Sequence, residues 1–183
     1  LVSFDAASFH MPSEITKIGW HRKTWYHTDQ SYLRNDYECI QSWVTAFDVE
    51  EGDATLAFLE KSHKYHKDFA KHFEIKEKDN WYKLDLEEQV DFYKNKGCIE
   101  NTIQCPKGSM VFWDSRTIHC GVEPKKTRLN SKFRCVVYLC YLPRSMSNEK
   151  ELKKKIKAFE EKRMTSHWPN KVKLFPKMPR TYG

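Results

Sequence analysis

One short segment constrains the fold more than any other. Trp25-Tyr26-His27-Thr28-Asp29-Gln30 carries a histidine and an aspartate two positions apart. Side chains at i and i+2 of a β-strand leave the same face, so His27 and Asp29 can act as neighbouring ligands of one metal ion. A third ligand must come from elsewhere, and the best candidate is His119, about ninety positions on and directly after a strand-like run. The fold must therefore bring two distant segments together.

Length and composition are typical of one folded domain. A chain of 183 residues can bury a substantial core, and an aromatic content of 14% favours a packed, strand-rich domain over disorder. No apolar run approaches the ~18 residues that a membrane span needs, so we expect no membrane-spanning helix. The sequence begins with Leu1 rather than methionine, so we expect it to be part of a longer chain.

The six cysteines are Cys39, Cys98, Cys105, Cys120, Cys135 and Cys140, and no two of them form a C-x-x-C pair. Several lie in apolar runs, where a free cysteine behaves as a small core residue. We therefore expect buried thiols in a reducing compartment rather than disulfides or a zinc site, which favours a cytoplasmic location.

Strand-like runs separated by polar turns dominate the sequence. Strands are predicted at residues 1–12, around the metal motif, and at 37–47, 54–59, 101–105, 109–113 and 133–141. Many short strands favour a closed or double-sheet β architecture, a jelly roll of the cupin type. The predicted fold class is thus mainly β, with residues 60–100 as a helical insertion outside the sheet core.

Two stretches of the insertion have a helical pattern. The clearer one runs from Asp85 to about Lys96, with Asp85 as the cap, Glu88 as its capping-box partner and Gly97 as a left-handed stop. A weaker one covers residues 63–73. It contains His63 and His66, which we interpret as surface residues because no carboxylate or cysteine accompanies them.

The positive charge is concentrated in the last forty residues. From Arg144 to Gly183 there are twelve Lys and Arg against four Glu, whereas the preceding 143 residues carry 20 basic and 21 acidic residues. We predict a core over residues 1–143, then a helix from Asn148 to about Arg163 capped by Ser147, and an extended tail containing Trp168, Phe175, Arg180 and Tyr182. The tail is either a solvated basic surface or a docking site for an anionic partner.

A charged residue follows His119 in the next strand. Arg134 shares one strand face with Val136, Tyr138 and Cys140. An arginine inside a barrel can grip a dicarboxylate bidentately, which suits 2-oxoglutarate. Two histidines and one carboxylate on one side of a metal, with free positions opposite, are the pattern of non-haem Fe(II) oxygenases.

Taken together, these segments resemble the phytanoyl-CoA dioxygenase family of Fe(II)/2-oxoglutarate-dependent oxygenases, over roughly residues 1–142. The matching segments are His27-Thr28-Asp29, Gln41-Ser42-Trp43, Gly52 to His63, Gly108 to His119, and Asn130-Ser131 with Arg134. The resemblance implies a double-stranded β-helix in which His27, Asp29 and His119 bind iron and Arg134 anchors the far carboxylate of 2-oxoglutarate. Gln41 and Trp43 would line the pocket, or they are simply packing residues.

The sequence departs from the family pattern in two places. The segment between His119 and Arg134 is longer than in many members, which leaves Arg128 as an alternative anchor. A helical N-terminal portion common in the family is absent.

Three functional hypotheses follow. The first is a hydroxylase that acts on an unidentified, small-molecule substrate and releases succinate and CO2. The second is a non-catalytic relative that binds an anionic partner through the basic tail. The third is a metal-dependent isomerase or hydrolase of cupin type.

Overall fold

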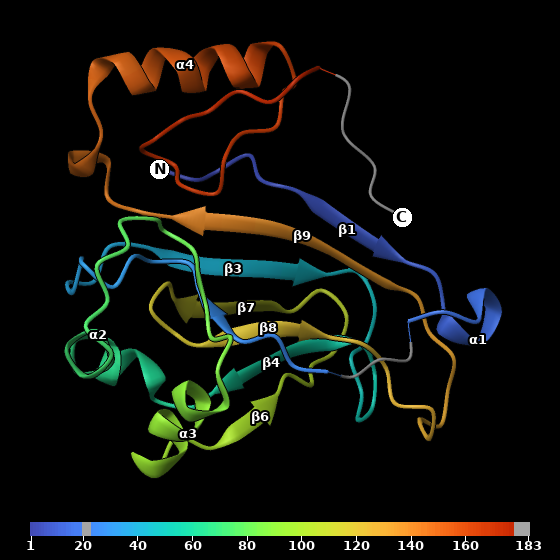
Figure 1. Ribbon diagram of the computed structural model, residues 1–183. Coiled ribbons are helices and arrows are strands. Elements are labelled where there is room, and N and C mark those ends of the chain that lie inside the picture. The colour runs from blue at the N-terminus through green and yellow to red at the C-terminus, as the bar shows by residue number, and fades with distance from the viewer. Residues whose placement is uncertain (20–22, 178–183) are drawn as a thin grey trace.

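The computed structural model describes residues 1–19 and 23–177 (Figure 1). Two antiparallel sheets pack face to face as a double-stranded β-helix, which confirms the predicted fold class. The first sheet has the order β1 (Ala7–His10), β9 (Arg134–Tyr141), β3 (Ile40–Thr45) and β7 (Met110–Asp114). The second has the order β5 (Tyr82–Lys83), β2 (His27–Thr28), β8 (His119–Val122), β4 (Thr55–Leu59) and β6 (Glu100–Thr102).

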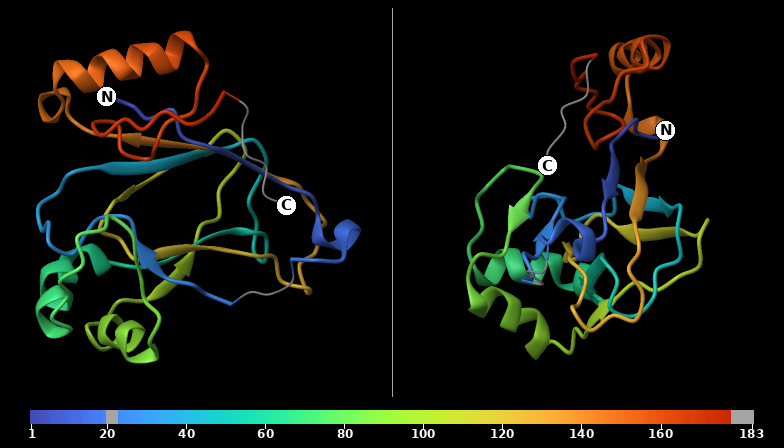
Figure 2. Two further views of the ribbon diagram at one scale, coloured as in Figure 1. Left: turned by 45° about the horizontal axis from the view of Figure 1, so that its top comes forward. Right: turned by 90° about the vertical axis from the view of Figure 1, so that its right-hand side faces the viewer.

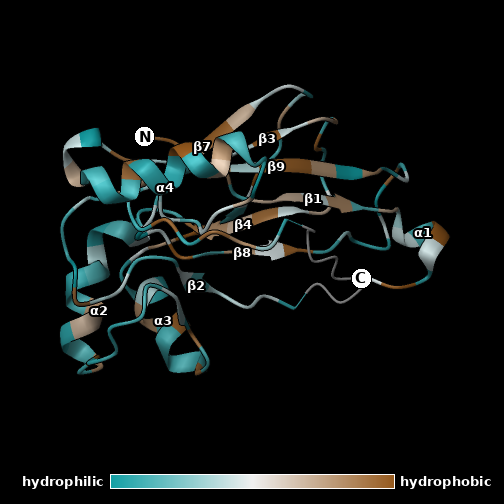
Figure 3. Cartoon of the chain, turned by 90° about the horizontal axis from the view of Figure 1, so that it is seen from above, coloured by the Kyte–Doolittle hydropathy of each residue, from teal (hydrophilic) through white to brown (hydrophobic). Residues whose placement is uncertain are grey.

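The helices lie outside the two sheets. They are α1 (Ser13–Thr16), α2 (His66–His72), α3 (Glu87–Asn95) and α4 (Glu149–Glu160), with single 3₁₀ turns at Ser62–Tyr65 and Arg144–Met146. Helices α2 and α3 cover the outer side of the second sheet, and α4 lies on the opposite side of the molecule, beyond β9 (Figures 1 and 2). Seen from above, helices α2, α3 and α4 are mainly hydrophilic (Figure 3).

Alternating side chains divide the second sheet between two cores. Leu56 points between the sheets and packs with Trp43 and Val136 of the first sheet. Its neighbours Ala57 and Leu59 point outward to the insertion. This alternation is what the two-residue period of a strand requires when both faces of a sheet are covered.

The insertion belongs to the sheet more closely than predicted. Its segment β5 pairs with β2, so that Lys83 lies opposite His27. Its helices bring Phe69 and Tyr93, both fully buried with ring centroids 5.1 Å apart, against the outer face of the second sheet. The helices of residues 60–100 lie outside the sheets, as predicted, but Tyr82 and Lys83 join the second sheet at its edge beside the metal motif.

Helix α3 confirms a predicted helix but not its cap. The N-cap is Leu86, whose backbone N–H donates to the side chain of Gln89, so Gln89 takes the role expected of Glu88. Asp85 instead forms an ion pair with Lys83 at 2.5 Å. Gly97, with φ of 81°, adopts the predicted left-handed conformation.

Two further expectations need correction. Helix α4 is capped by Asn148, which accepts from the backbone N–H of Glu151 at 3.0 Å, and not by Ser147. His66 is buried rather than on the surface: its ring stacks on Tyr32 with centroids 4.4 Å apart, and burial lowers its pKa to about 4.

The six cysteines are free, and four of them are buried. No helix within residues 1–19 and 23–177 is both long and apolar enough to cross a bilayer. Arg180 and Tyr182 of the predicted tail lie outside the described residues.

Arg128 ties three segments together at one end of the barrel. Its guanidinium donates to Glu14 of α1 at 2.5 and 2.7 Å, and to Asp53, which precedes β4, at 3.1 Å. The Arg128 and Asp53 side chains are only 3% and 8% exposed. The hydrogen bond from Arg128 lowers the pKa of Glu14 to about 2.

We expect Arg128→Ala to lower the free energy of unfolding by about 3 kcal/mol at neutral pH, because it leaves Asp53 buried without its partner. Since the folded-state pKa of Glu14 is depressed, this stabilisation is present above pH 4.5 and is lost as the pH falls toward about 2. Urea unfolding at neutral and acidic pH measures both effects. Lys125→Ala, at an exposed lysine in the same loop, is the control and should change stability by less than about 0.5 kcal/mol. An equal loss in both variants would contradict the assignment.

Candidate metal centre

The register of the second sheet brings the two predicted histidines together. His27 of β2 lies directly opposite His119 of β8. Their ring centroids are 4.5 Å apart. Both side chains are buried, with 6% and 4% of the residue exposed. A separation of about ninety positions along the chain is thus closed by a single cross-strand pair.

Asp29 completes the group. Its Oδ1 lies 3.8 Å from Nε2 of His27, and its Oδ2 lies 3.4 Å from Nε2 of His119. One ligand atom of each of the three residues lies within 4.8 Å of the others, a spacing at which one metal ion could be held. The structure therefore brings together the three residues that the sequence proposed as ligands.

Backbone carbonyls fix the direction of both imidazoles. Nδ1 of His119 contacts the carbonyl of Thr117 at 2.9 Å, and Nδ1 of His27 contacts the carbonyl of Trp25 at 3.3 Å. An Nδ1–H that donates to a carbonyl leaves Nε2 with its lone pair, which is the form that binds a metal. Both Nε2 atoms face Asp29.

The electrostatics of the group suit a cation. Burial would raise the pKa of Asp29, but the contact with His119 and the other nearby imidazoles hold it well below its usual range. Burial, aided by His119, lowers the pKa of His27 to about 4. At neutral pH the carboxylate is therefore charged and the His27 imidazole is neutral, as metal ligands must be.

Aromatic rings that the sequence analysis did not single out hold these imidazoles. Trp25 stacks on His27 with centroids 4.5 Å apart and planes 12° apart, and its indole N–H donates to the carbonyl of Gly121 at 2.9 Å. Trp113 of β7 meets His119 edge-on at 5.4 Å. Trp25 lies two residues before His27, so both side chains leave the same strand face. This spacing could have identified Trp25 from the sequence as a neighbour of His27.

Gln41 and Trp43 lie on the inner face of β3. The Gln41 amide donates to Oδ2 of Asp29 at 2.6 Å. Trp43 is 1% exposed and belongs to the core between the sheets. Gln41 Oε1 and the indole nitrogens of Trp43 and Trp113 are buried without a hydrogen-bond partner. Buried polar atoms are rarely left unpaired, so these three fit a polar ligand between the sheets beside the triad.

The two candidate anchor arginines have different partners. Arg128 is fully engaged by Glu14 and Asp53. Arg134 makes long contacts with hydroxyls, at 3.5 Å to Ser8 and 3.4 Å to Tyr138, and no carboxylate within residues 1–19 and 23–177 pairs with it. Of these two arginines, Arg134 is therefore the one whose guanidinium can bind an anionic ligand.

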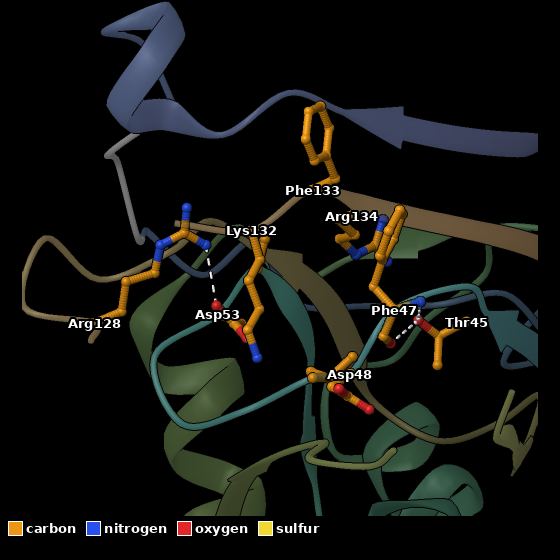
Figure 4. Close-up of a pocket in the computed structure, with 10 residues that line it drawn as sticks. Thr45, Phe47, Asp48, Asp53, Arg128, Lys132, Phe133 and Arg134 are labelled. Atoms are coloured by element: carbon orange, nitrogen blue, oxygen red, sulfur yellow. Dashed lines mark hydrogen bonds and ion pairs between the residues drawn. The ribbon is translucent and has the colours of Figure 1, made fainter. Parts of the chain in front are cut away.

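Figure 4 shows the end of the barrel where both arginines lie, with Arg128 turned to Asp53. Arg134 borders this small cavity of about 10 Å³, and also a cavity of about 470 Å³ beside α1. Tyr138, which contacts Arg134, lies opposite Trp43 in the sheet, and Trp43 is two residues from Gln41. A line of inward-facing residues thus connects the triad to Arg134.

A further histidine reaches the centre from the C-terminal region. Nε2 of His167 lies 3.7 Å from Oδ2 of Asp29, and the imidazole also contacts the Gln41 amide. Burial lowers the pKa of His167, but a hydrogen bond with Asp5 and the charge of Asp29 outweigh burial and raise it to about 9. Nothing in the local sequence indicates this position, since a solvated basic surface and a docking site for an anionic partner are the two functions that the tail sequence predicts.

Comparisons with known proteins found several relatives of partial length. Ava biosynthesis cluster protein O of Aspergillus versicolor is 23% identical over 180 residues, which cover 93% of this chain and 56% of that protein. AviO1 of Streptomyces viridochromogenes is 15% identical, with a TM-score of 0.45 over 76% of this chain and 49% of that one. SnoN, described as a non-haem alpha-ketoglutarate-dependent epimerase from nogalamycin biosynthesis, is 12% identical, with a TM-score of 0.45 over 74% and 46%. The chain thus spans about half the length of these relatives.

The sequence model of the family described as phytanoyl-CoA dioxygenase matches residues 5–124, well over half of the chain. The matched region contains His27, Asp29 and His119, the three residues that the fold brings together. By this match the chain belongs to the phytanoyl-CoA dioxygenase family, whose members depend on Fe(II) and 2-oxoglutarate.

Proposed function

We propose that the chain carries the core of an Fe(II)- and 2-oxoglutarate-dependent dioxygenase that hydroxylates a small organic substrate and releases succinate and CO2. The observation that carries the proposal is the buried group of His27, Asp29 and His119, with ligand atoms within 4.8 Å of one another. Two imidazoles and one carboxylate are the ligand set of non-haem Fe(II) oxygenases. Iron and 2-oxoglutarate supply the oxidative chemistry when they are bound.

The protein residues bind, orient and shield. His27, Asp29 and His119 would hold the metal, and Arg134 would bind the far carboxylate of 2-oxoglutarate with two N–H groups. Gln41 fixes Asp29, and the buried indole of Trp43 keeps water out of the space between the sheets. The unpaired nitrogens of Trp43 and Trp113 are donors that an oxygen-rich co-substrate can satisfy.

A role for the basic C-terminal helix in binding an anionic partner is a second proposal, compatible with the first. Lys150, Lys153 and Lys157 of the α4 region are exposed, so their charges are accessible to a partner. A chain that used only this surface would not need a buried triad together with an unpaired Arg134, which favours the enzyme.

Anaerobic addition of Fe(II) and 2-oxoglutarate should produce a weak visible charge-transfer band. His119→Ala should abolish it, because the variant removes one of the three metal ligands. His72→Ala, at an exposed histidine of α2, is the control and should retain the band. Absence of the band from folded, metal-loaded protein would exclude the oxygenase assignment. Oxygen consumption and succinate release over a panel of metabolites would then identify the substrate.

Arg134→Ala should weaken 2-oxoglutarate binding about 100-fold, or roughly 3 kcal/mol, while the affinity for the metal is retained. Arg134→Lys should recover part of the loss, since it keeps the charge but not the bidentate geometry. Titration of the charge-transfer band with 2-oxoglutarate measures both variants. If Arg134→Ala bound 2-oxoglutarate as the wild type does, the anchor would have to be another residue.

A further inference from the structure

The C-terminal hairpin, defined here as residues 164–175, lies between α4 and the first sheet, beside the N-terminal segment (Figures 1 and 2). Thr165 and Leu174 pair across it, and Thr165 exchanges hydrogen bonds with Phe4 at 2.7 and 3.1 Å. Trp168 is 6% exposed and packs with Cys39 and Cys140. The hairpin therefore has a defined position, and that position brings His167 to the metal centre.

His167 is held from one side and contacts the centre on the other. Its Nδ1 lies 2.7 Å from Oδ2 of Asp5. Its Nε2 contacts the same Gln41 amide nitrogen that donates to Asp29 at 2.6 Å. Gln41 thus lies between His167 and the Asp29 carboxylate. The side chains of Asp5, His167, Gln41 and Asp29 form a continuous series of polar contacts, called the polar chain below.

The contacts of this chain all bear on one carboxylate oxygen. Nδ1 of His167 contacts Asp5, the Gln41 amide N–H donates to Oδ2 of Asp29, and Nε2 of His167 lies 3.7 Å from that same Oδ2. His167 and Gln41 therefore both face one oxygen of the Asp29 carboxylate.

We propose that His167, fixed by Asp5, is a positioning residue that orients the Asp29 carboxylate for the metal through Gln41. The C-terminal hairpin is then part of the metal centre and not merely a basic surface. This inference rests on the proposed function, since it assigns Asp29 as a metal ligand. Partners that orient a metal ligand commonly change metal affinity 10- to 100-fold when they are removed.

Cobalt(II) titration of the full chain, with a chelating indicator as competitor, tests the proposal without any need for a substrate. His167→Ala should raise the dissociation constant for cobalt(II) about 10-fold. His167→Gln, whose amide can contact Gln41 where Nε2 stood, should recover part of the loss. Asp5→Asn should weaken binding, and its effect should not add to that of His167→Ala, because both changes break one chain.

The variant Thr165→Val distinguishes the positioning of Asp29 by His167 from the docking of the hairpin on the N-terminal segment. It removes the hydroxyl that accepts from Phe4, so it should lower the thermal midpoint while leaving the cobalt(II) affinity unchanged. Equal losses of affinity in Thr165→Val and His167→Ala would overturn the proposal, as would wild-type affinity in folded His167→Ala.

The spectrum gives a further outcome. Asp5, Cys140 and His167 have ligand atoms within 4.8 Å of one another, so a thiolate-to-cobalt band would mean that His167 binds an ion of its own, and would also overturn the proposal. If the wild type bound no cobalt(II), the proposed function itself would fail. Normal wild-type binding with an unaffected His167→Ala variant would remove this inference alone.

Discussion

The metal centre depends on one cross-strand pair, His27 opposite His119. Strand β2 is only two residues long, yet it is paired on both sides, with β8 through His119 and with β5 through Lys83. A strand this short has little stability of its own, so its neighbours set its position. The insertion that supplies β5 therefore supports the candidate metal centre directly, although its helices lie on the outer side of the sheet.

A buried polar group must be satisfied from several directions. The imidazoles use backbone carbonyls for Nδ1, and Asp29 uses the amide of Gln41 from the opposite sheet. The centre therefore fixes the distance between the sheets as well as the register within one of them. Some buried polar atoms near it remain unpaired, among them Oε1 of Gln41. Such atoms are costly in a purely structural core, and they are expected where a ligand completes the network.

The local periodicity of the sequence made many of the strands and the candidate metal ligands predictable. The i, i+2 spacing of His27 and Asp29, the strand after them and the alternation that includes Arg134 all follow from the two-residue period of strands. The cap of α3 was missed by one position, because Glu88 and Gln89 are chemically alike as capping partners. The burial of His66 and the arrival of His167 were missed for another reason. Both depend on contacts between segments far apart in the chain, which leave no local pattern.

The choice between Arg128 and Arg134 shows what only the fold can decide. Both follow His119 in the sequence and both carry the same charge, but Arg128 is neutralised by two carboxylates and Arg134 faces hydroxyls. The space between the sheets thus has the Asp29 carboxylate toward one end and, toward the other, the Arg134 guanidinium, which pairs with no carboxylate among residues 1–19 and 23–177. Asp29 also faces His167 across 3.7 Å, whereas Arg134 faces hydroxyls. The proposed cation would therefore share the Asp29 carboxylate with His167, and the proposed dicarboxylate would be held by Arg134.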